Sequence, residues 1–537
     1  MPRISIDQQT IEVAAGATVL DAARRLGVDI PTLCHLKGYR PQNSCLLCLV
    51  KVDGSPRLRP ACSLPAAEGV VIESETDEVR AARRTALELL LSDHAGDCIA
   101  PCQNNCPAHM DVPLMMRQIV GEEFEAAIRT VKAEIPLPAV LGRICPAPCE
   151  GGCRRKPGDA PVAVCLLKRF VADEDLSRDE PFVPACQAPS GRTVAVVGAG
   201  PAGLAAAYEL QLRGHACTLY DNNAQPGGAL RYAIDRQVLP LDVLDGEIDI
   251  IRRLGAQFVM NWHMGVDGTL DELRRRHNAV LLAMGPVHDQ AGELALATMP
   301  RGVSVDKRTF QTQRPDVFAA GGALGRTRLA VRSVAQGKDA ARCIDRYLRG
   351  DDPADAEQTV NVSMGPLAEQ ELAALMLQAS PNDRLSPEGG LMRGFNRAEA
   401  LAEAGRCLQC SCRGAGDCRI RALATQYGAN PRRYRGAARR RLSRVQRQGG
   451  VVFEPGKCIS CGLCVAIVRQ MGEPIGLSFV GRGFDVHLAV PGGAGIARGL
   501  GQAARACVEA CPTAALRFAS PEPLVPLTVG AQPIAGP

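Results

Sequence analysis

The stretch from Arg192 to Gly203, RTVAVVGAGPAG, constrains the fold more than any other part of the sequence. A Val-rich run before a Gly-rich turn is typical of a buried parallel strand, and Gly198, Gly200 and Gly203 fit the G-x-G-x-x-G pattern that opens a helix. These glycines permit a tight turn and the close approach of a pyrophosphate. A second strand, CTLYD, ends at Asp221, where a ribose-binding carboxylate is expected. A Gly-rich turn without a ligand is the alternative, and the combined context favours a Rossmann-like nucleotide site.

Cysteines are the second constraint, because the 537 residues include 23 of them. The N-terminus lacks a charged and apolar signal, and no run approaches the roughly 20 apolar residues of a membrane span. We therefore expect a reducing cytoplasm, in which thiols are ligands rather than disulfides. The length suggests about three to five domains. A net charge of +5 and 4% aromatic residues give no argument for nucleic acid.

The first segment, residues 1–80, is expected to be a small α+β domain in which Thr18 and Asp21 cap a helix that stops at Gly27. It carries a Cys-x-x-Cys pair with two outlying cysteines, and soft thiolates in this arrangement suit an iron–sulfur cluster better than a zinc finger or ribbon. The stretch NSCLLCLVKVDG and the spacing resemble the N-terminal 2Fe-2S domain of the large iron–sulfur subunit of respiratory NADH dehydrogenase and its hydrogenase and formate dehydrogenase relatives. The resemblance implies a β-grasp fold and one 2Fe-2S cluster on Cys34, Cys45, Cys48 and Cys62.

Residues 81–188 are expected to be helical with two groups of cysteines, in DCIAPCQNNCPAH and GRICPAPCEGGCRR. Both stretches resemble the double 4Fe-4S domain of the glutamate synthase small subunit and dihydropyrimidine dehydrogenase. The resemblance implies that each cluster takes ligands from both stretches: one cluster binds Cys98, Cys102 and Cys153, and the other binds Cys106, Cys145 and Cys149.

Each of these two clusters then needs a fourth ligand. His94 precedes Cys98 by four residues, as a ligand histidine does in the NADH dehydrogenase relatives, although it could instead cap or pack. For the second cluster the family often places Gln or Glu where this chain has Lys168, and a cationic Lys has no lone pair to donate. Cys165, one helical turn earlier on the same face, is the substitute, with a small buried hydrophobe as its alternative role.

Residues 189–350 are expected to bind FAD, because YDNNAQPGGALRYAI and RPDVFAAGGALGRT resemble the two ends of the FAD domain in the same glutamate synthase-like family. One departure is Gly322, where the family has an Asp that contacts the ribityl chain. The residues that the resemblance assigns to FAD are Gly198, Gly200, Pro201, Ala202, Gly203, Asp221, Gly227, Gly228, Gly321 and Gly322.

A deletion is the larger departure from that family. Between Gly285 and Val317, where family members insert a second Rossmann domain for NAD(P)H, only about thirty residues intervene, and no second G-x-G-x-x-G occurs. The sequence therefore predicts that the chain does not bind a nicotinamide nucleotide in the usual way.

Residues 351–448 are expected to be a linker that carries a dense cysteine motif, RCLQCSCRGAGDC. Zinc or a 4Fe-4S cluster would accept these four thiols, and the company of other clusters favours iron on Cys407, Cys410, Cys412 and Cys418. The stretch PRRYRGAARRRLSRVQRQ, with eight arginines, is interpreted as a solvated face; docking to an acidic partner and nucleic acid are the alternatives.

Residues 449–519 are expected to be a ferredoxin-like α+β domain with one of two clusters lost. FEPGKCISCGLCVAIV begins a bacterial ferredoxin run, and the last cysteine of RACVEACPTAAL completes it, because the fourth cysteine of each run ligates the other cluster. The predicted 4Fe-4S ligands are Cys458, Cys461, Cys464 and Cys511. The lost site has Val468, Gly501 and Ala504 at ligand positions and leaves Cys507 without a cluster. FVGRGFDVHLAVP resembles the same segment in formate dehydrogenases and hydrogenases, and the tail 520–537 is expected to be a docking strap or disordered.

Together these patterns predict an α/β multidomain protein with FAD, one 2Fe-2S cluster and about four 4Fe-4S clusters. The resemblances imply a cytoplasmic electron-transfer subunit of a hetero-oligomeric oxidoreductase of the formate dehydrogenase, hydrogenase or 2-oxoacid oxidoreductase type. It would connect a catalytic subunit with a NAD(P)-linked or ferredoxin partner, without nucleic acid, a membrane span or catalytic residues of its own. The alternatives are a self-contained NAD(P)H-dependent reductase of the glutamate synthase small subunit type and an iron–sulfur scaffold or regulator.

Overall fold

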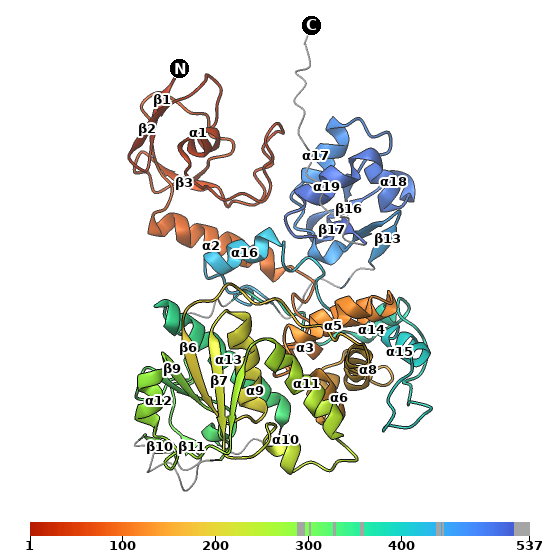
Figure 1. Ribbon diagram of the computed structural model, residues 1–537. Helices are drawn as coiled ribbons and strands as arrows, with labels where there is room; N and C mark the ends of the chain where they lie inside the picture. Colours follow the sequence, from red (N-terminus) through yellow and green to blue (C-terminus); the bar gives the residue numbers. More distant parts are fainter. Residues whose placement is uncertain are drawn as a thin grey trace. The chain divides into compact units, whose positions relative to one another are not determined.

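The computed structural model describes residues 1–286, 296–299, 302–325, 329–354, 359–436, 442 and 445–519. The chain divides into two compact units, each made of segments that are far apart in sequence (Figure 1). Unit 1 comprises residues 1–98, 358–366 and 412–537, and unit 2 comprises residues 99–357 and 367–411. Within the described residues, no helix is both long and apolar enough to cross a membrane.

Unit 1 begins with a five-stranded mixed sheet in the order β2-β1-β5-β3-β4, in which β1 pairs parallel with β5 and the other pairs are antiparallel. Helix α1 starts with the predicted capping box between Thr18 and Asp21 and ends at Gly27, whose φ of 75° suits glycine. The elements are β1 (Arg3–Ile6), β2 (Gln9–Glu12), α1 (Val19–Leu26), β3 (Leu49–Val52), β4 (Arg59–Pro60) and β5 (Val71–Glu73).

Helix α2 connects this sheet with the later segments of unit 1. Its residue Arg83 is fully buried and donates to the Leu49 carbonyl oxygen of β3 at 3.0 Å and to the Tyr427 hydroxyl, just after α16, at 2.9 Å. The guanidinium also pairs with Glu75. Because burying a guanidinium is costly unless it is hydrogen-bonded, these contacts hold α2 (Asp77–Ser92) between β3 and α16 (Arg419–Gln426), although the Arg83 Nε atom has no partner among the described residues.

The C-terminal part of unit 1 has a three-stranded sheet in the order β13-β14-β17 and a two-stranded sheet of β15 and β16, all antiparallel. Helices α17 and α19 pack with these strands around Val451, Phe453, Ile467 and Leu500. The elements are β13 (Gln446–Gln448), β14 (Val451–Phe453), η2 (Pro455–Lys457), α17 (Leu463–Gln470), β15 (Ser478–Val480), η3 (Gly483–Asp485), β16 (His487–Ala489), η4 (Pro491–Gly493), α18 (Ile496–Leu500), η5 (Gly501–Ala503), α19 (Ala504–Ala510) and β17 (Leu516–Phe518).

Unit 2 contains a parallel five-stranded sheet in the order β12-β9-β6-β7-β8, as the Rossmann-like pattern predicts. Alternate residues of β6 bury on opposite faces: Val194 and Val196 pack with α9, α11 and α13, whereas Ala195 and Val197 pack with α12. The strands are β6 (Thr193–Val197), β7 (Ala216–Asp221), β8 (Gln257–Met260), β9 (Ala279–Leu282) and β12 (Val317–Ala319), with a small hairpin of β10 (Thr298–Met299) and β11 (Gly302–Val303).

The helices of this sheet domain come into very close contact at glycines. A Cβ at Gly337 of α13 would lie 2.1 Å from the Ala202 carbonyl oxygen, so the backbone of α13 touches that of α9. These helices and turns are α9 (Pro201–Leu212), α10 (Ala229–Tyr232), α11 (Leu241–Arg253), α12 (Leu270–Arg276), η1 (Gly321–Leu324) and α13 (Ala330–Arg349).

The remainder of unit 2 is helical and forms its own core around Met115, Ile128, Leu141 and Phe170. Two short helices, α3 and α7, place cysteines at their ends, and α6 ends at Cys145. The elements are α3 (Pro101–Asn105), α4 (Val112–Val120), α5 (Phe124–Lys132), α6 (Pro138–Ile144), α7 (Pro148–Gly151), α8 (Val164–Leu176), α14 (Glu369–Met376) and α15 (Arg397–Ala404).

Candidate functional site

A cavity of about 980 Å³ opens at the carboxyl ends of the parallel strands of unit 2. The strand order turns at β6, which has β7 on one side and β9 on the other, and ligands bind at such switch points. Residues of the Gly-rich turn line the cavity together with Asp221 and Gly228, the second of two glycines before α10. Of the predicted residues, the cavity lining includes Gly198, Gly200, Pro201, Ala202, Asp221, Gly228 and Gly322.

The two glycine-rich loops of this cavity support each other. A Cβ at Gly203 would lie 1.8 Å from the Gly198 carbonyl oxygen, and a Cβ at Gly228 would lie 2.9 Å from the Gly200 Cα. Gly227, just before, donates its amide to the Ala199 carbonyl oxygen at 2.8 Å. Side chains are excluded from these contacts, so the two loop backbones pack directly on each other. The start of α9, at Gly200 to Ala202, lines the cavity, and a helix N-terminus of this kind is a site for a pyrophosphate.

Asp221 ends β7 at the cavity wall, as predicted. Its carboxylate accepts hydrogen bonds from the amides of Ala199 at 2.6 Å and Asn223 at 2.9 Å. The side chain therefore holds the first glycine loop against the end of β7. Its assignment to the ribose stays a prediction.

The close contacts around Gly322 explain why this position departs from the family pattern. A Cβ at this position would lie 2.9 Å from the Gly285 Cα and 3.0 Å from the Gly285 carbonyl carbon. The chain that leaves β9 therefore crosses directly over Gly322, and an Asp side chain has no room there. Gly321, the neighbouring predicted residue, has a φ of 66° and sits against the Ala202 side chain.

Aromatic residues of the cavity were not predicted from the sequence. Trp262 lies beyond the end of β8, and its ring centroid is 4.9 Å from that of Tyr220. Its backbone amide donates to the Asp221 carbonyl oxygen at 2.9 Å. His263 and Met264 also line the cavity. The sequence signal was weak, since this Trp follows a four-residue strand without a recognisable motif.

The first cysteine group lies in the loops of the N-terminal sheet domain of unit 1. All four thiols, those of Cys34, Cys45, Cys48 and Cys62, are buried. The sulfur atoms of Cys34 and Cys45 lie 3.3 Å apart, and the Cys34 sulfur accepts the Cys45 amide at 3.4 Å. The hydrogen bond from Cys45 lowers the pKa of Cys34 to about 5, and that from Cys62 lowers the pKa of Cys48 to about 7. The same hydrogen bonds, together with burial, raise the pKa of Cys45 and Cys62. The sequence-predicted 2Fe-2S residues are therefore brought together as two hydrogen-bonded pairs, each with one thiol of lowered pKa.

A second cysteine group, in unit 2, joins Cys106, Cys145, Cys149 and Cys165. A hydrogen bond from Cys165 lowers the pKa of Cys145 to about 7, and burial raises the pKa of Cys149 to about 12. Lys168 is buried beside these cysteines. Burial alone lowers the pKa of Lys168, but the neighbouring thiols, with Cys165 the largest contributor, raise it above its ordinary value. The structure thus places Cys165 where the sequence predicted a fourth ligand and adds a buried cation.

The third and fourth groups differ from the sequence expectation. In unit 2, burial is the main cause that raises the pKa of Cys102. The nearby thiols of Cys407, Cys410 and Cys153 raise this pKa further. In unit 1, His94, Cys98, Cys412 and Cys418 line one cavity. The sequence had grouped Cys98 with Cys102 and Cys153, and had treated the motif from Cys407 to Cys418 as one site. The structure brings together chain segments more than 200 residues apart, so the neighbours of these cysteines differ from those that the sequence suggested, and the ligand sets stay a prediction.

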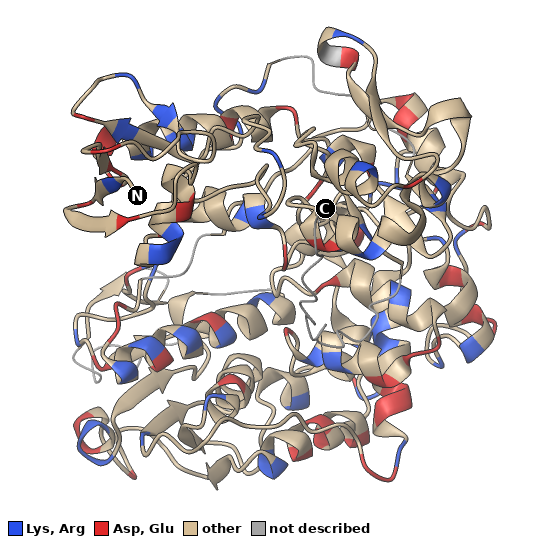
Figure 2. Cartoon of the chain, turned by 90° about the horizontal axis from the view of Figure 1, so that it is seen from above, with Lys and Arg blue, Asp and Glu red and all other residues tan. Residues whose placement is uncertain are grey.

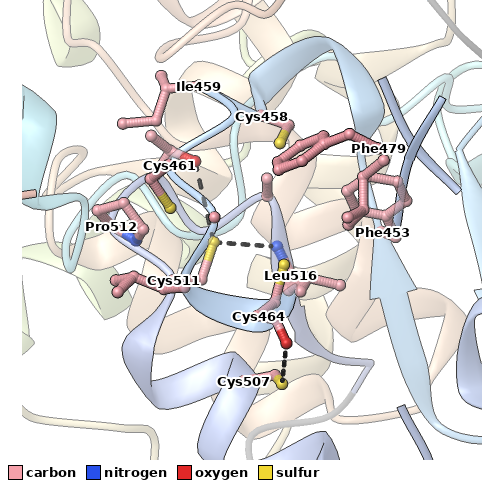
Figure 3. A pocket seen from close by; sticks show the side chains of 15 residues that line it. Phe453, Cys458, Ile459, Cys461, Cys464, Phe479, Cys507, Cys511, Pro512 and Leu516 are labelled. Carbon is pink, nitrogen blue, oxygen red and sulfur yellow. Dashed lines mark hydrogen bonds between the residues drawn. The ribbon is translucent and has the colours of Figure 1, made fainter. Parts of the chain in front are cut away.

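The last cysteine group forms a cavity near the C-terminus of unit 1, lined by Cys458, Cys461, Cys464 and Cys511 with Phe453 and Phe479 (Figure 3). The Cys511 sulfur accepts the Leu516 amide at 3.5 Å. Hydrogen bonds from amides to sulfur tune the reduction potential of a bound cluster. The predicted ligands are therefore together in the structure.

Protein side chains fill the position where the sequence predicts that a second cluster is lost. Val468 is buried, and the Cys507 thiol donates to the Cys464 carbonyl oxygen at 3.7 Å. Apolar residues were expected here, but Glu473 also enters: its carboxylate accepts the Ala503 amide at 2.9 Å and lies where a Cβ at Gly501 would be.

Among the described residues, no three His, Cys, Asp or Glu side chains converge tightly enough to hold one metal ion. A tetrahedral zinc site with Zn–S bonds of about 2.3 Å would hold its sulfurs about 3.8 Å apart. The Cys34 and Cys45 sulfurs are closer than that, at 3.3 Å, so these distances do not decide between zinc and a cluster, and the assignment to iron–sulfur clusters stays a prediction.

Part of the arginine-rich stretch is bound within unit 1. Arg433 pairs with the buried Glu88 at 3.2 Å, and Arg435 donates to the Met364 carbonyl oxygen at 2.5 Å. Residues 437–441 and 443–444, and the tail 520–537, lie outside the described residues. Figure 2 shows basic and acidic residues interspersed along the described chain. Arg433 and Arg435 thus make contacts within unit 1, and for the remaining arginines the interpretation as a solvated face stays a prediction.

Comparisons with known proteins agree with these sites. A model of the 2Fe-2S iron–sulfur cluster binding domain matches residues 2–77, and a model of dihydropyrimidine dehydrogenase domain II, 4Fe-4S cluster, matches residues 79–180. A model of the NAD(P)-binding Rossmann-like domain matches residues 196–253. The chain therefore contains a 2Fe-2S domain, a 4Fe-4S domain and a Rossmann-like domain, and the resemblance seen in the sequence is confirmed.

Three curated relatives illustrate the similarity. The beta subunit of NADP(+)-dependent formate dehydrogenase from Moorella thermoacetica is 40% identical over 35% of this chain and 29% of its own length. The PreT subunit of NAD-dependent dihydropyrimidine dehydrogenase from Escherichia coli K12 is 38% identical over 37% of this chain and 49% of its own length. Glutamate synthase [NADH] from Saccharomyces cerevisiae is 31% identical over 40% of this chain and 10% of its own length. The chain thus spans at most about half the length of these relatives.

Proposed function

We propose that this chain is an electron-transfer subunit of a hetero-oligomeric oxidoreductase and that it binds FAD and five iron–sulfur clusters. The observation that carries the proposal is the coexistence of one dinucleotide cavity with five separate groups of cysteines, one of them including His94. Iron–sulfur clusters exchange electrons one at a time, whereas structural zinc does not exchange electrons. So many sites in one chain serve transport rather than structure.

The cavity fits FAD by the chemistry of its lining. The N-terminus of α9, at Gly200 to Ala202, would hold the pyrophosphate, and Asp221 would bind the ribose. A flavin supplies the exchange between two-electron and one-electron chemistry. The crossing at Gly285 and Gly322 closes the sheet where relatives of the glutamate synthase type carry their NAD(P)H domain.

The finer fold assignments belong to the same proposal. We take residues 1–80 as a β-grasp 2Fe-2S domain and residues 449–519 as a ferredoxin-like domain with one 4Fe-4S cluster. The partners would be a catalytic subunit of the formate dehydrogenase, hydrogenase or 2-oxoacid oxidoreductase type and a NAD(P)-linked or ferredoxin protein. A reducing cytoplasm, in which cysteines remain available as cluster ligands, is part of the same proposal.

An anaerobic titration of the purified chain with its clusters tests the proposal. The nucleotide released by denaturation should be FAD. Dithionite should bleach the flavin and iron–sulfur absorbance, whereas NADH and NADPH should leave both unchanged. Bleaching by either nicotinamide nucleotide would instead show a self-contained reductase.

A further inference from the structure

We propose that the cysteine motif from Cys407 to Cys418 is divided between two iron–sulfur sites. His94, Cys98, Cys412 and Cys418 hold one 4Fe-4S cluster within unit 1, and Cys102, Cys153, Cys407 and Cys410 hold another within unit 2. This inference rests on the proposed iron–sulfur function and specifies its ligand sets. Five clusters are still accommodated, but two of them exchange ligands relative to the sequence expectation.

Backbone hydrogen bonds build the site in unit 1. The Cys412 amide donates to the Asp97 carbonyl oxygen at 2.8 Å, which fixes Cys412 beside Cys98. A second segment of unit 1 completes the frame: the Cys98 amide donates to the Val362 carbonyl oxygen at 2.9 Å, and the Val362 amide donates to the Cys98 sulfur at 3.4 Å. The Met364 amide donates to the Asp97 carboxylate at 2.7 Å. These hydrogen bonds therefore hold Cys98 and Cys412 next to each other.

The donor set of this site is incomplete without a metal cluster. The Nδ1 atom of His94 is buried and has no hydrogen-bond partner in the structure. Its imidazole lines the same cavity as Cys98, Cys412 and Cys418. A buried imidazole nitrogen left unpaired costs free energy, which coordination of iron would remove. Three thiols and one such nitrogen are the four donors that a cubane cluster needs.

Two buried arginines build the site in unit 2. Arg155, two residues after Cys153, donates at 2.8 Å to the carbonyl oxygen of Arg406, the residue before Cys407. Arg406 in turn donates to the Ala160 carbonyl oxygen at 2.9 Å and to Glu403 at 2.8 Å. Both guanidinium side chains are almost completely buried. They bind the Cys153 loop to the Cys407 loop over more than 250 residues of sequence.

The first cysteine of this site, Cys102, is brought in by helix α3. A Cβ at Gly152 would lie 2.9 Å from the Pro101 carbonyl oxygen and 2.6 Å from Asn105, so the Cys153 loop lies directly on α3. Burial raises the pKa of Cys407 to about 11, and the Cys153 thiol contributes to the same shift. The four thiols of the set therefore lie within interaction range of one another.

Unit boundaries coincide with this division of ligands. The chain passes from unit 1 to unit 2 between Cys98 and Ile99, and back between Ser411 and Cys412. At the first boundary Cys98 of the unit 1 set is followed by Cys102 of the unit 2 set. At the second boundary Cys410 of the unit 2 set is followed by Cys412 of the unit 1 set. A site made of Cys407, Cys410, Cys412 and Cys418 alone would instead draw on both units.

Iron counts of matched double variants test the proposal in the full chain. Cys98→Ala/Cys418→Ala should lose about four iron atoms, because both residues serve one cluster, whereas Cys410→Ala/Cys412→Ala should lose about eight. If the motif were self-contained, the losses would be reversed. The control is retention of FAD and of the 2Fe-2S signal in electron paramagnetic resonance.

A second measurement covers variants that fail to fold. Pulsed paramagnetic resonance should detect histidine nitrogen coupled to one reduced cluster in the wild type and not in His94→Cys. Cys418→Ser should perturb that same signal, and Cys102→Ser should leave it unchanged; the opposite pattern overturns the ligand sets. Wild-type chain with far fewer than about eighteen iron atoms would contradict the proposed function itself, which separates the two failures.

Discussion

Replacing Lys168 should lower the reduction potential of the cluster site formed by Cys106, Cys145, Cys149 and Cys165. Lys168 lies on α8, three residues after Cys165, and its side chain is almost completely buried among these thiols. A buried ammonium stabilises the extra negative charge of a reduced cluster. Lys168→Gln removes that charge while keeping a side chain of similar length.

The size of the effect follows from Coulomb's law. With a separation of about 6 Å and an effective dielectric constant of about 20, the attraction is about 3 kcal/mol. For one electron this corresponds to a fall of about 120 mV. Lys168→Arg keeps the positive charge and should stay much closer to the wild-type potential.

A redox titration monitored by paramagnetic resonance measures this shift. The signal to follow is the one that Cys106→Ala abolishes. An unchanged or raised potential in Lys168→Gln, with iron content intact, would refute the electrostatic role of this side chain.

Four further predictions concern other parts of the chain. Gly322→Ala should lower the FAD content per chain without changing the iron content, because its Cβ would press on Gly285; equal loss of both would indicate general unfolding instead. Cys507→Ala should leave the iron count unchanged, since this thiol bonds a carbonyl oxygen, and a loss of about four iron atoms would contradict the single-cluster assignment. Burial raises the pKa of Glu247 to about 7, so the folded state favours the protonated carboxyl. The free energy of unfolding should therefore fall by about 3 kcal/mol as the pH rises from about 4.5 to 7. Denaturant titrations of Glu247→Gln should lack this fall. Arg83→Met should cost about 2 to 4 kcal/mol in denaturant titration because it strands buried acceptors, and a cost below about 1 kcal/mol would show that α2 is fixed by other contacts.

Local patterns allowed much of the fold to be predicted. The strand before Gly198 and the strand that ends at Asp221 are adjacent and parallel, and the capping box at Thr18 and Asp21 forms as expected. Each of these features depends on residues close in sequence, where periodicity and capping chemistry decide the structure. Cysteine spacing likewise predicted the first and last cysteine groups.

The remaining site features depend on contacts between distant segments. No local spacing relates Cys98 to Cys412 or Cys153 to Cys407, because the connection runs through backbone hydrogen bonds and the buried Arg155. Trp262 likewise reaches the cavity only because β8 lies beside β7. Such contacts are consequences of tertiary packing and carry no signature in a window of sequence.

The crossing at Gly322 also marks where this architecture can gain or lose a whole module. Strands β9 and β12 are hydrogen-bonded neighbours, with Val280 opposite Val317. Because the two strands run parallel, the chain leaves β9 at the carboxyl edge of the sheet and must return to the amino edge to begin β12. A guest domain inserted in this connection therefore leaves the sheet intact only if the chain still makes that return. The connection after Gly285 is thus a place where a further domain can be added without changing the pairing of the strands.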